Sequence, residues 1–180
     1  ASALTDDNSR AYVTLRSGHA VAVVDTMALQ QIDTIRDDPT DAATNGINPI
    51  ALSIDARPFW IAIDNGQEYA FVTDERASTI YVIDVDPTST TYNKWVDTIL
   101  VDNGEHDLLG YLLAPYGLRG LAVSESTGQL LVAAPGYDQI FPPLIKTPGD
   151  EMRPGHLLVF DISNIRQRIR VGTRDRKSVV

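Results

Sequence analysis

The chain contains no cysteine, which excludes disulfides, thiolate metal sites and cysteine nucleophiles together. Basic residues are also scarce, since 15 lysines and arginines stand against 24 aspartates and glutamates and leave a formal net charge of −9. Attraction to phosphates dominates nucleic-acid affinity, so this balance argues against nucleic acid as a partner. No apolar run approaches the ~20 residues of a membrane helix, so we expect no membrane span.

Several catalytic signatures are missing as well. The sequence has no Gly-x-Ser-x-Gly elbow, no phosphate loop and no dinucleotide fingerprint. His19, His106 and His156 lack ligand spacing such as His-x-x-x-His. We therefore expect no cofactor and no metal ion. Hydrophobic residues make up 43% of the chain and charged residues 22%, which is enough apolar surface for one globular unit.

An internal repeat organises the chain. Ala3, Ala62 and Ala122 occupy equivalent positions, each ten residues before a central valine. From that alanine to a closing aspartate is 22 residues in two copies and 39 in the third, which implies an insertion of 17 residues. The matching segments are Tyr-Val-Thr at 12–14 before 20–25, Phe-Val-Thr at 71–73 before 80–84, and Leu-Val-Ala at 131–133 before 157–161.

Each copy contains four strand-length segments rich in Val, Ile, Tyr and Phe, separated by polar turns. In the second copy we place strands near 59–63, 68–73, 79–84 and 94–100. The third segments are apolar almost without alternation, so both faces of each sheet should be covered. The sequence therefore predicts an all-β partial β-propeller with three four-stranded antiparallel blades, roughly at residues 1–57, 58–117 and 118–174.

These segments resemble the YVTN family of β-propeller repeats. Residues 11–14 with 21–25, and 70–73 with 80–84, match the pattern closely, and 131–134 with 157–161 match it more loosely. The resemblance implies kinship with surface-layer-associated and lactonase-like propellers, mostly exported proteins, and so an extracellular, cell-surface or periplasmic location. Two features depart from the family. Leu15, Asp74 and Ala134 replace its Asn after Tyr-Val-Thr, and the copies are longer than its unit.

Three blades are fewer than a closed propeller needs, which points to further blades as partners. Propellers close with typically ~4–8 blades, so we expect the remaining blades of the same parent chain to complete a longer propeller. Residues 175–180, Asp-Arg-Lys-Ser-Val-Val, match the translation of a widely used sequencing adapter in one frame. We interpret them as a non-native tail after a propeller fragment that ends near Arg174, and we expect that tail to pack against nothing specific.

Loop lengths indicate where function should lie. In an up-and-down blade, the turn between the second and third strands and the connection to the next blade emerge on one face. That face should carry the large elaborations at 36–57, 102–117 and 135–155, and long loops on a rigid scaffold are the usual place for binding. We predict that an unknown protein or small-molecule ligand contacts this face through aromatic and guanidinium groups. The candidate residues are Trp60, Arg76, Arg119 and Tyr137.

Two functions from different classes fit this pattern. The leading hypothesis is a non-catalytic binding or structural module of an exported or cell-surface bacterial protein, without catalytic residues. The alternative is a propeller hydrolase of the lactonase type, in which Glu75, Arg76 and Arg119 polarise a substrate carbonyl and activate water. A redox-protein propeller is a third possibility, but no cofactor-ligand motif supports it.

Two groups of acidic residues could be taken for functional sites, but structural roles explain them more simply. Asp25, Asp84 and Asp161 each end a strand, where an aspartate commonly bonds the backbone of the following turn. We expect that role for them rather than a ring of carboxylates. The acidic run at 37–41 lacks the order of ligands in a calcium loop, so we expect a solvated loop there.

Overall fold

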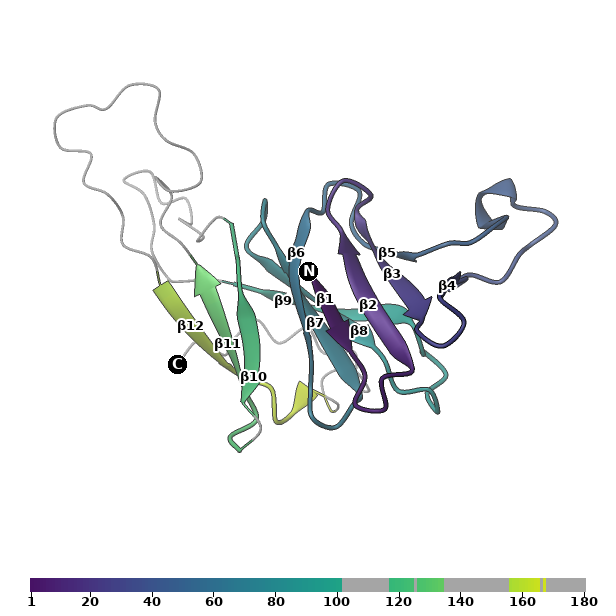
Figure 1. Cartoon of the computed structure of the whole chain (residues 1–180). Helices are drawn as coiled ribbons and strands as arrows, with labels where there is room; N and C mark the ends of the chain where they lie inside the picture. The colour runs from purple at the N-terminus through teal and green to yellow at the C-terminus, as the bar shows by residue number, and fades with distance from the viewer. Residues whose placement is uncertain (102–116, 125, 135–155, 166, 168–180) are drawn as a thin grey trace, which may run out of the picture.

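The structure is a computed structural model that describes residues 1–101, 117–124, 126–134, 156–165 and 167. These residues form three antiparallel β-sheets that stand side by side (Figure 1). The first sheet contains β1 (Ser2–Leu4), β2 (Arg10–Leu15), β3 (Ala20–Asp25), β4 (Gln30–Ile32) and β5 (Ile50–Ala51), with a short 3-10 helix, η1 (Ala42–Thr44), before β5. The second contains β6 (Pro58–Ile63), β7 (Tyr69–Asp74), β8 (Thr79–Asp84) and β9 (Lys94–Leu100), and the third contains β10 (Leu121–Ser124), β11 (Gln129–Ala134) and β12 (His156–Asp161). The predicted all-β architecture of antiparallel propeller blades is confirmed.

The strands of the second blade lie close to their predicted positions. All four strands are present, and each predicted end lies within one residue of the observed end. Strand order follows chain order, β6-β7-β8-β9, with short polar turns after β6 and β7 and a longer connection at 85–93 before β9. Hydrophobic pattern and turn chemistry were therefore sufficient to place this blade.

The three equivalent alanines lie on the innermost strands, as predicted. β1, β6 and β10 are the first strands of their sheets, and β6 contacts both β1 and β10 (Figure 1). The first hairpin of each sheet also has the same register. In each one the alanine faces the residue nine positions later, which gives the pairs Ala3–Tyr12, Ala62–Phe71 and Ala122–Leu131.

The core divides into two clusters, one on each side of the middle sheet. Alternation along β8 sends Tyr81 and Ile83 into the cluster shared with the first sheet, and Ile80 and Val82 into the cluster shared with the third. All four side chains are buried. An apolar run without alternation is therefore what a strand between two other sheets requires.

The same pattern does not hold in every third strand. β3 is buried from Ala20 to Val23, but in β12 Phe160 is the one buried residue and Leu157 is 68% exposed. β12 belongs to the last of the three sheets, so no further sheet among the described residues covers its far face.

The predicted loop at 36–57 is not one continuous loop, because it contains the short strand β5. β4 and β5 both pair with β3, so the outer strand of the first sheet is formed in two pieces. Between them the chain leaves the outer edge of the sheet (Figure 1), and the Thr34 N–H closes the excursion by donating to the Asn48 carbonyl at 3.0 Å. Residues 52–57 alone remain as a connection to β6. The prediction failed because a two-residue strand leaves no hydrophobic pattern.

Other predicted features lie outside the described residues. They are residues 102–116, residues 135–155 with Tyr137, the fourth strand of the third blade and the tail at 175–180. Among the described residues, no helix is long and apolar enough to cross a membrane.

Two threonines link neighbouring sheets at equivalent positions. The Thr73 hydroxyl accepts a hydrogen bond from the backbone N–H of Trp60, in its own sheet, at 3.1 Å. The same hydroxyl donates to the backbone carbonyl of Arg119, which leads into the third sheet, at 2.7 Å. The Thr14 hydroxyl likewise donates to the Phe59 carbonyl of the second sheet at 3.3 Å. The threonine of each Tyr/Phe-Val-Thr segment therefore joins the inner strands of two blades.

The strand-ending aspartates have the structural role expected of them. Each accepts a hydrogen bond from the backbone N–H two residues later, which fixes the turn that follows the strand. The bonds run from Met27 to Asp25 at 2.9 Å, from Asp86 to Asp84 at 3.0 Å, and from Ser163 to Asp161 at 2.9 Å.

Asp7, in the first hairpin turn, is expected to titrate well below an ordinary aspartate. The Thr5 hydroxyl donates to its carboxylate at 2.6 Å and the Ser9 N–H at 2.9 Å, which lowers the pKa of Asp7 to about 2. Because the unfolded pKa is about 3.9, the stabilisation is present above that pH and is lost as pH falls through the folded pKa. NMR titration of the carboxyl carbon measures this value directly.

A hydroxyl deletion tests the cause. Thr5→Val should raise the pKa of Asp7 toward the ordinary value. Thr88→Val removes the equivalent hydroxyl beside Asp86 and should leave Asp7 unchanged. An Asp7 pKa near 4 in the unmodified protein would contradict the assignment.

Candidate functional site

One end of the sheets gathers the candidate residues. We call it the upper rim, and it consists of residues 16–19, 52–57, 75–78 and 117–120, where β2 and β7 end and β6 and β10 begin (Figure 1). Antiparallel order dictates this placement, because alternate strand ends meet at the same edge. The strand ends that flank residues 102–116 and 135–155 lie at this rim too.

Three charged side chains from three sheets meet at the upper rim, and we call them the rim triad. Arg16 donates through Nε to Oε2 of Glu75, and Nη1 of Arg119 forms an ion pair with Oε1 of Glu75 at 2.7 Å. The Glu75 side chain is 9% exposed, whereas those of Arg16 and Arg119 are 58% and 31% exposed. A carboxylate this buried requires charged or hydrogen-bonding partners, and the two guanidinium groups supply them.

The repeat explains why these charges meet. Arg16 and Glu75 each lie three residues after the central valine of their copies, so they are equivalent residues of opposite charge on adjacent blades. Sequence analysis named Glu75 and Arg119 but missed Arg16. Aligning the first two copies of the repeat would have identified Arg16, because it occupies the position equivalent to Glu75.

A bulge in β6 displays two aromatic residues. The pairing of β6 with β7 shifts register between Pro58 and Ile61, and Phe59 and Trp60 lie within that shift. Bulges commonly redirect side chains beside functional sites. Phe59 supports Arg119, whose guanidinium carbon lies 4.3 Å from the ring centroid, and Trp60 is 44% exposed.

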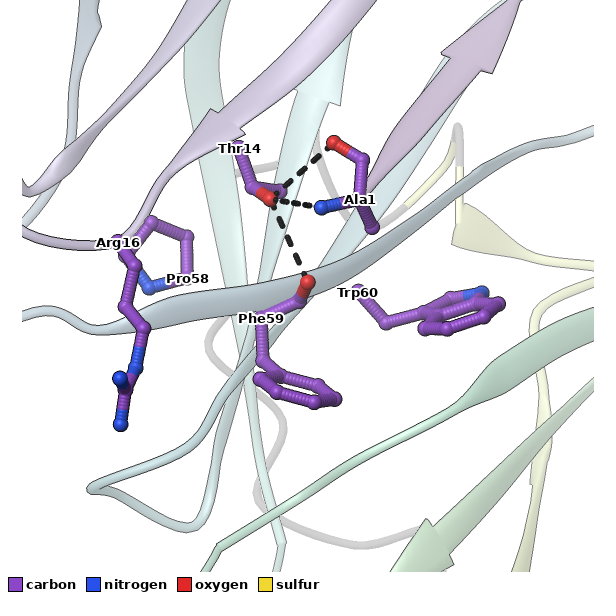
Figure 2. Close-up of a pocket in the computed structure, with 6 residues that line it drawn as sticks. All are labelled: Ala1, Thr14, Arg16, Pro58, Phe59 and Trp60. Atoms are coloured by element: carbon purple, nitrogen blue, oxygen red, sulfur yellow. Dashed lines mark hydrogen bonds between the residues drawn. The ribbon is translucent and has the colours of Figure 1, made fainter.

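A small pocket lies beside these aromatic residues. Its volume is about 220 Å³, and Figure 2 shows its lining residues, with the Arg16 and Trp60 side chains pointing to opposite sides of Phe59. The Thr14 hydroxyl donates to the Phe59 carbonyl beside this pocket. The lining residues are Ala1, Thr14, Arg16, Pro58, Phe59 and Trp60.

Asp74 fixes the turn that carries Glu75. Its Oδ1 accepts from the backbone N–H groups of Arg76 at 2.7 Å and Ala77 at 3.1 Å, and its Oδ2 accepts from the Tyr81 hydroxyl at 3.1 Å. Burial, followed by the charge of Asp74, raises the pKa of the Tyr81 phenol and keeps it a donor. Asp74 is 1% exposed, so the turn is held from inside the protein.

The structure brings some of the predicted site residues together and separates others. Trp60 lies on β6 next to the upper rim, and Arg119 lies in the rim two residues before β10. Arg76 lies at the same rim, but its Nη1 is 3.6 Å from Oδ1 of Asp55, so it pairs there and not with Glu75. Tyr137 lies outside the described residues.

His19 has a structural partner. Its Nδ1 hydrogen-bonds to the carbonyl of Ala56, which ties the β2–β3 turn to the connection entering β6. Within the described ranges, no group of three His, Asp or Glu side chains is arranged to hold a metal ion.

Comparison with known proteins supports the fold. No family model matches this sequence, and no curated protein matches it. A solved structure of a proposed 6-phosphogluconolactonase from Bacteroides uniformis matches with a TM-score of 0.57 at 9% identity, over 99% of this chain and 38% of that one. Such a match at such low identity supports a β-propeller-type fold and shows nothing about activity.

Two further structures match less well. A luciferin-regenerating enzyme has a TM-score of 0.47 at 14% identity, over 74% of this chain and 36% of that one. Hydrazine synthase of Kuenenia stuttgartiensis has a TM-score of 0.43 at 17% identity, over 89% of this chain and 50% of that one. The chain therefore spans half or less of the length of each of these three structures.

Proposed function

We propose that this chain is part of a non-catalytic binding propeller of the YVTN repeat type, from an exported or cell-surface bacterial protein, and that its ligand or partner contacts the upper rim. An exposed tryptophan, a pocket and two arginines at the ends of rigid strands support this proposal. Aromatic and arginine side chains are the residues that dominate binding energies at recognition surfaces.

The observation that carries the non-catalytic assignment is the bonding of Glu75. Its Oε2 accepts a hydrogen bond from Arg16 Nε, its Oε1 forms an ion pair with Arg119, and the side chain is 9% exposed. A general base must reach a water molecule beside the substrate, and this carboxylate has little open surface from which to do so.

The position of Arg76 supports the same conclusion. The lactonase-type alternative needs Glu75, Arg76 and Arg119 around one substrate carbonyl. Arg76 instead pairs with Asp55, while Arg119 pairs with Glu75. The three side chains therefore do not converge on one point.

Lactone hydrolysis tests the proposal against the enzyme alternative. The 180-residue chain should hydrolyse 6-phosphogluconolactone and glucono-1,5-lactone no faster than buffer alone, as followed by proton release. Acceleration that is lost in Glu75→Gln and retained in Arg36→Gln would overturn the non-catalytic assignment. Arg36 is a suitable control because it is exposed and lies in the excursion between β4 and β5.

Alanine substitution tests the site. A compound library can be screened by thermal shift, and each hit retested on single alanine variants. Changing Trp60, Arg76, Arg119 or Tyr137 should weaken binding by about tenfold or more, about 1.4 kcal/mol each. Arg76→Ala and Tyr137→Ala should leave the melting temperature nearly unchanged, and Arg36→Ala should change neither quantity. Unchanged binding in all four variants would refute this placement of the site.

A further inference from the structure

The upper rim concentrates positive charge on an otherwise acidic protein. Its charged side chains are four arginines and two acids, namely Arg16, Arg57, Arg76, Arg119, Asp55 and Glu75. The other described residues include three basic side chains, Arg10, Arg36 and Lys94, and many more aspartates and glutamates. Glu75 is 9% exposed and already paired on both oxygens, so Asp55 is the exposed acid of the rim. The rim therefore attracts anions that the rest of the described surface repels.

Two of these arginines have donors that the fold leaves open. In the described part of the chain, Arg57 is exposed and its side chain makes no hydrogen bond or ion pair. Arg76 is 55% exposed, and its Nη1 lies 3.6 Å from Asp55, beyond the length of an ordinary hydrogen bond. The Glu75 N–H donates to the Arg57 carbonyl at 2.9 Å, which places the two arginines on adjoining segments. Each guanidinium group can bind a carboxylate through two parallel hydrogen bonds.

Ile54 stands beside these arginines on a turn that is held in place. Its side chain is 85% exposed, and the turn is closed by the Ala56 N–H, which donates to the Ser53 carbonyl at 2.8 Å. At the start of the same connection, the Leu52 N–H donates to the His19 carbonyl at 2.9 Å. A large apolar side chain on an ordered turn offers contact area at a small loss of entropy on binding.

The chemistry of this surface favours a protein segment over other anions. All four cations of the rim are arginines, whose planar groups suit carboxylates as well as phosphates. Ile54 adds exposed apolar surface, and arginine beside apolar side chains is typical of protein interfaces. A nucleic acid or a membrane extends beyond the rim and would meet the surrounding acidic surface, from which charges are screened only over ~8 Å. A short acidic segment can lie on the rim alone.

We propose that the upper rim docks an acidic segment of a protein partner, with Arg57 and Arg76 binding its carboxylates and Ile54 contacting an apolar side chain next to them. The inference rests on the proposed binding function and names the kind of partner at that face. Arg16 and Arg119, which hold Glu75, extend the positive charge toward the third sheet.

Selection from a phage-displayed library of random peptides tests the kind of partner. The immobilised 180-residue chain should enrich peptides that combine aspartate or glutamate with a large apolar residue. Fluorescence anisotropy of a labelled synthetic copy then measures the affinity in solution. The same peptide with its acids replaced by asparagine and glutamine should bind about tenfold more weakly. Affinity for the acidic peptide should fall as the salt concentration rises.

Variants test whether the peptide lies on the rim. The double variant Arg57→Gln with Arg76→Gln, and the single variant Ile54→Ser, should each weaken binding by about tenfold. Arg36→Gln and Met27→Ser are the matched controls, because Arg36 is exposed in the excursion and Met27 is 87% exposed beyond the far end of β3. Both controls should bind as the unmodified chain does, and thermal unfolding establishes that each variant is folded.

The outcomes separate this inference from the proposed function. Enrichment of basic or neutral peptides, the absence of any enrichment, or unchanged affinity in the rim variants would overturn the assignment of an acidic segment. Tighter binding of a single-stranded oligonucleotide, or of vesicles that contain phosphatidylserine, would overturn it in favour of another anion. The proposed function is decided separately by lactone hydrolysis, because turnover would contradict a binding module even if acidic peptides bind.

Discussion

Replacing Asp74 with alanine is expected to lower the free energy of unfolding by about 3 kcal/mol, the largest effect we predict for a single polar residue. Its carboxylate is 1% exposed and accepts hydrogen bonds from two backbone N–H groups of the following turn and from the Tyr81 hydroxyl. A third backbone N–H, that of Arg57, lies 3.3 Å away. Alanine would leave these donors without their acceptor in a site with little water.

Urea unfolding followed by circular dichroism measures the loss, and Asp74→Asn is the matched control. Asparagine keeps one oxygen for the turn N–H groups and places an amide N–H₂ near the Tyr81 oxygen, so it should lose less than half as much. A loss under 1 kcal/mol for Asp74→Ala would contradict the proposed role of this turn. Asp74 stands where the resembled repeat has Asn, and its bonds to the turn show how aspartate performs the task that an asparagine oxygen can perform.

Replacing Thr73 with valine is expected to cost about 2 kcal/mol of unfolding free energy. Valine has nearly the shape of threonine, so the change removes the hydroxyl with little change in packing. The backbone N–H of Trp60 and the backbone carbonyl of Arg119 would each lose their hydrogen-bond partner. Thr73 itself is fully buried. Because these two groups belong to different sheets, the loss weakens the contact between two blades.

Two variants make the test of Thr73 specific. Thr73→Ser retains the hydroxyl and should cost less than Thr73→Val, although it removes a buried methyl group. Thr14→Val should cost less than Thr73→Val, because the bond from Thr14 to the next sheet is longer, 3.3 Å against 2.7 Å, and Thr14 is less buried than Thr73. Equal stability of Thr73→Val and the unmodified chain would show that the hydroxyl does not link the blades. The third copy has Ala133 at this position, so it cannot make the same link.

The candidate site was predictable in part. Trp60, Glu75 and Arg119 were singled out because aromatic and charged residues at strand ends are typical of recognition surfaces. Arg16 was missed because its importance comes from a partner 59 residues away along the chain. The pairing of Arg76 with Asp55 was equally hidden, since residue type alone does not say which of two nearby carboxylates an arginine faces.

The amino-acid sequence by itself determined the local structure of this protein. Strand positions in the second blade, the register of the inner hairpins and the turn aspartates follow from side-chain alternation, turn residues and the repeat, which act over a few residues. Only the tertiary structure decided how blades meet. The threonine links, the rim triad and the divided outer strand depend on the distance between sheets, and that distance is set by packing between residues far apart in the chain.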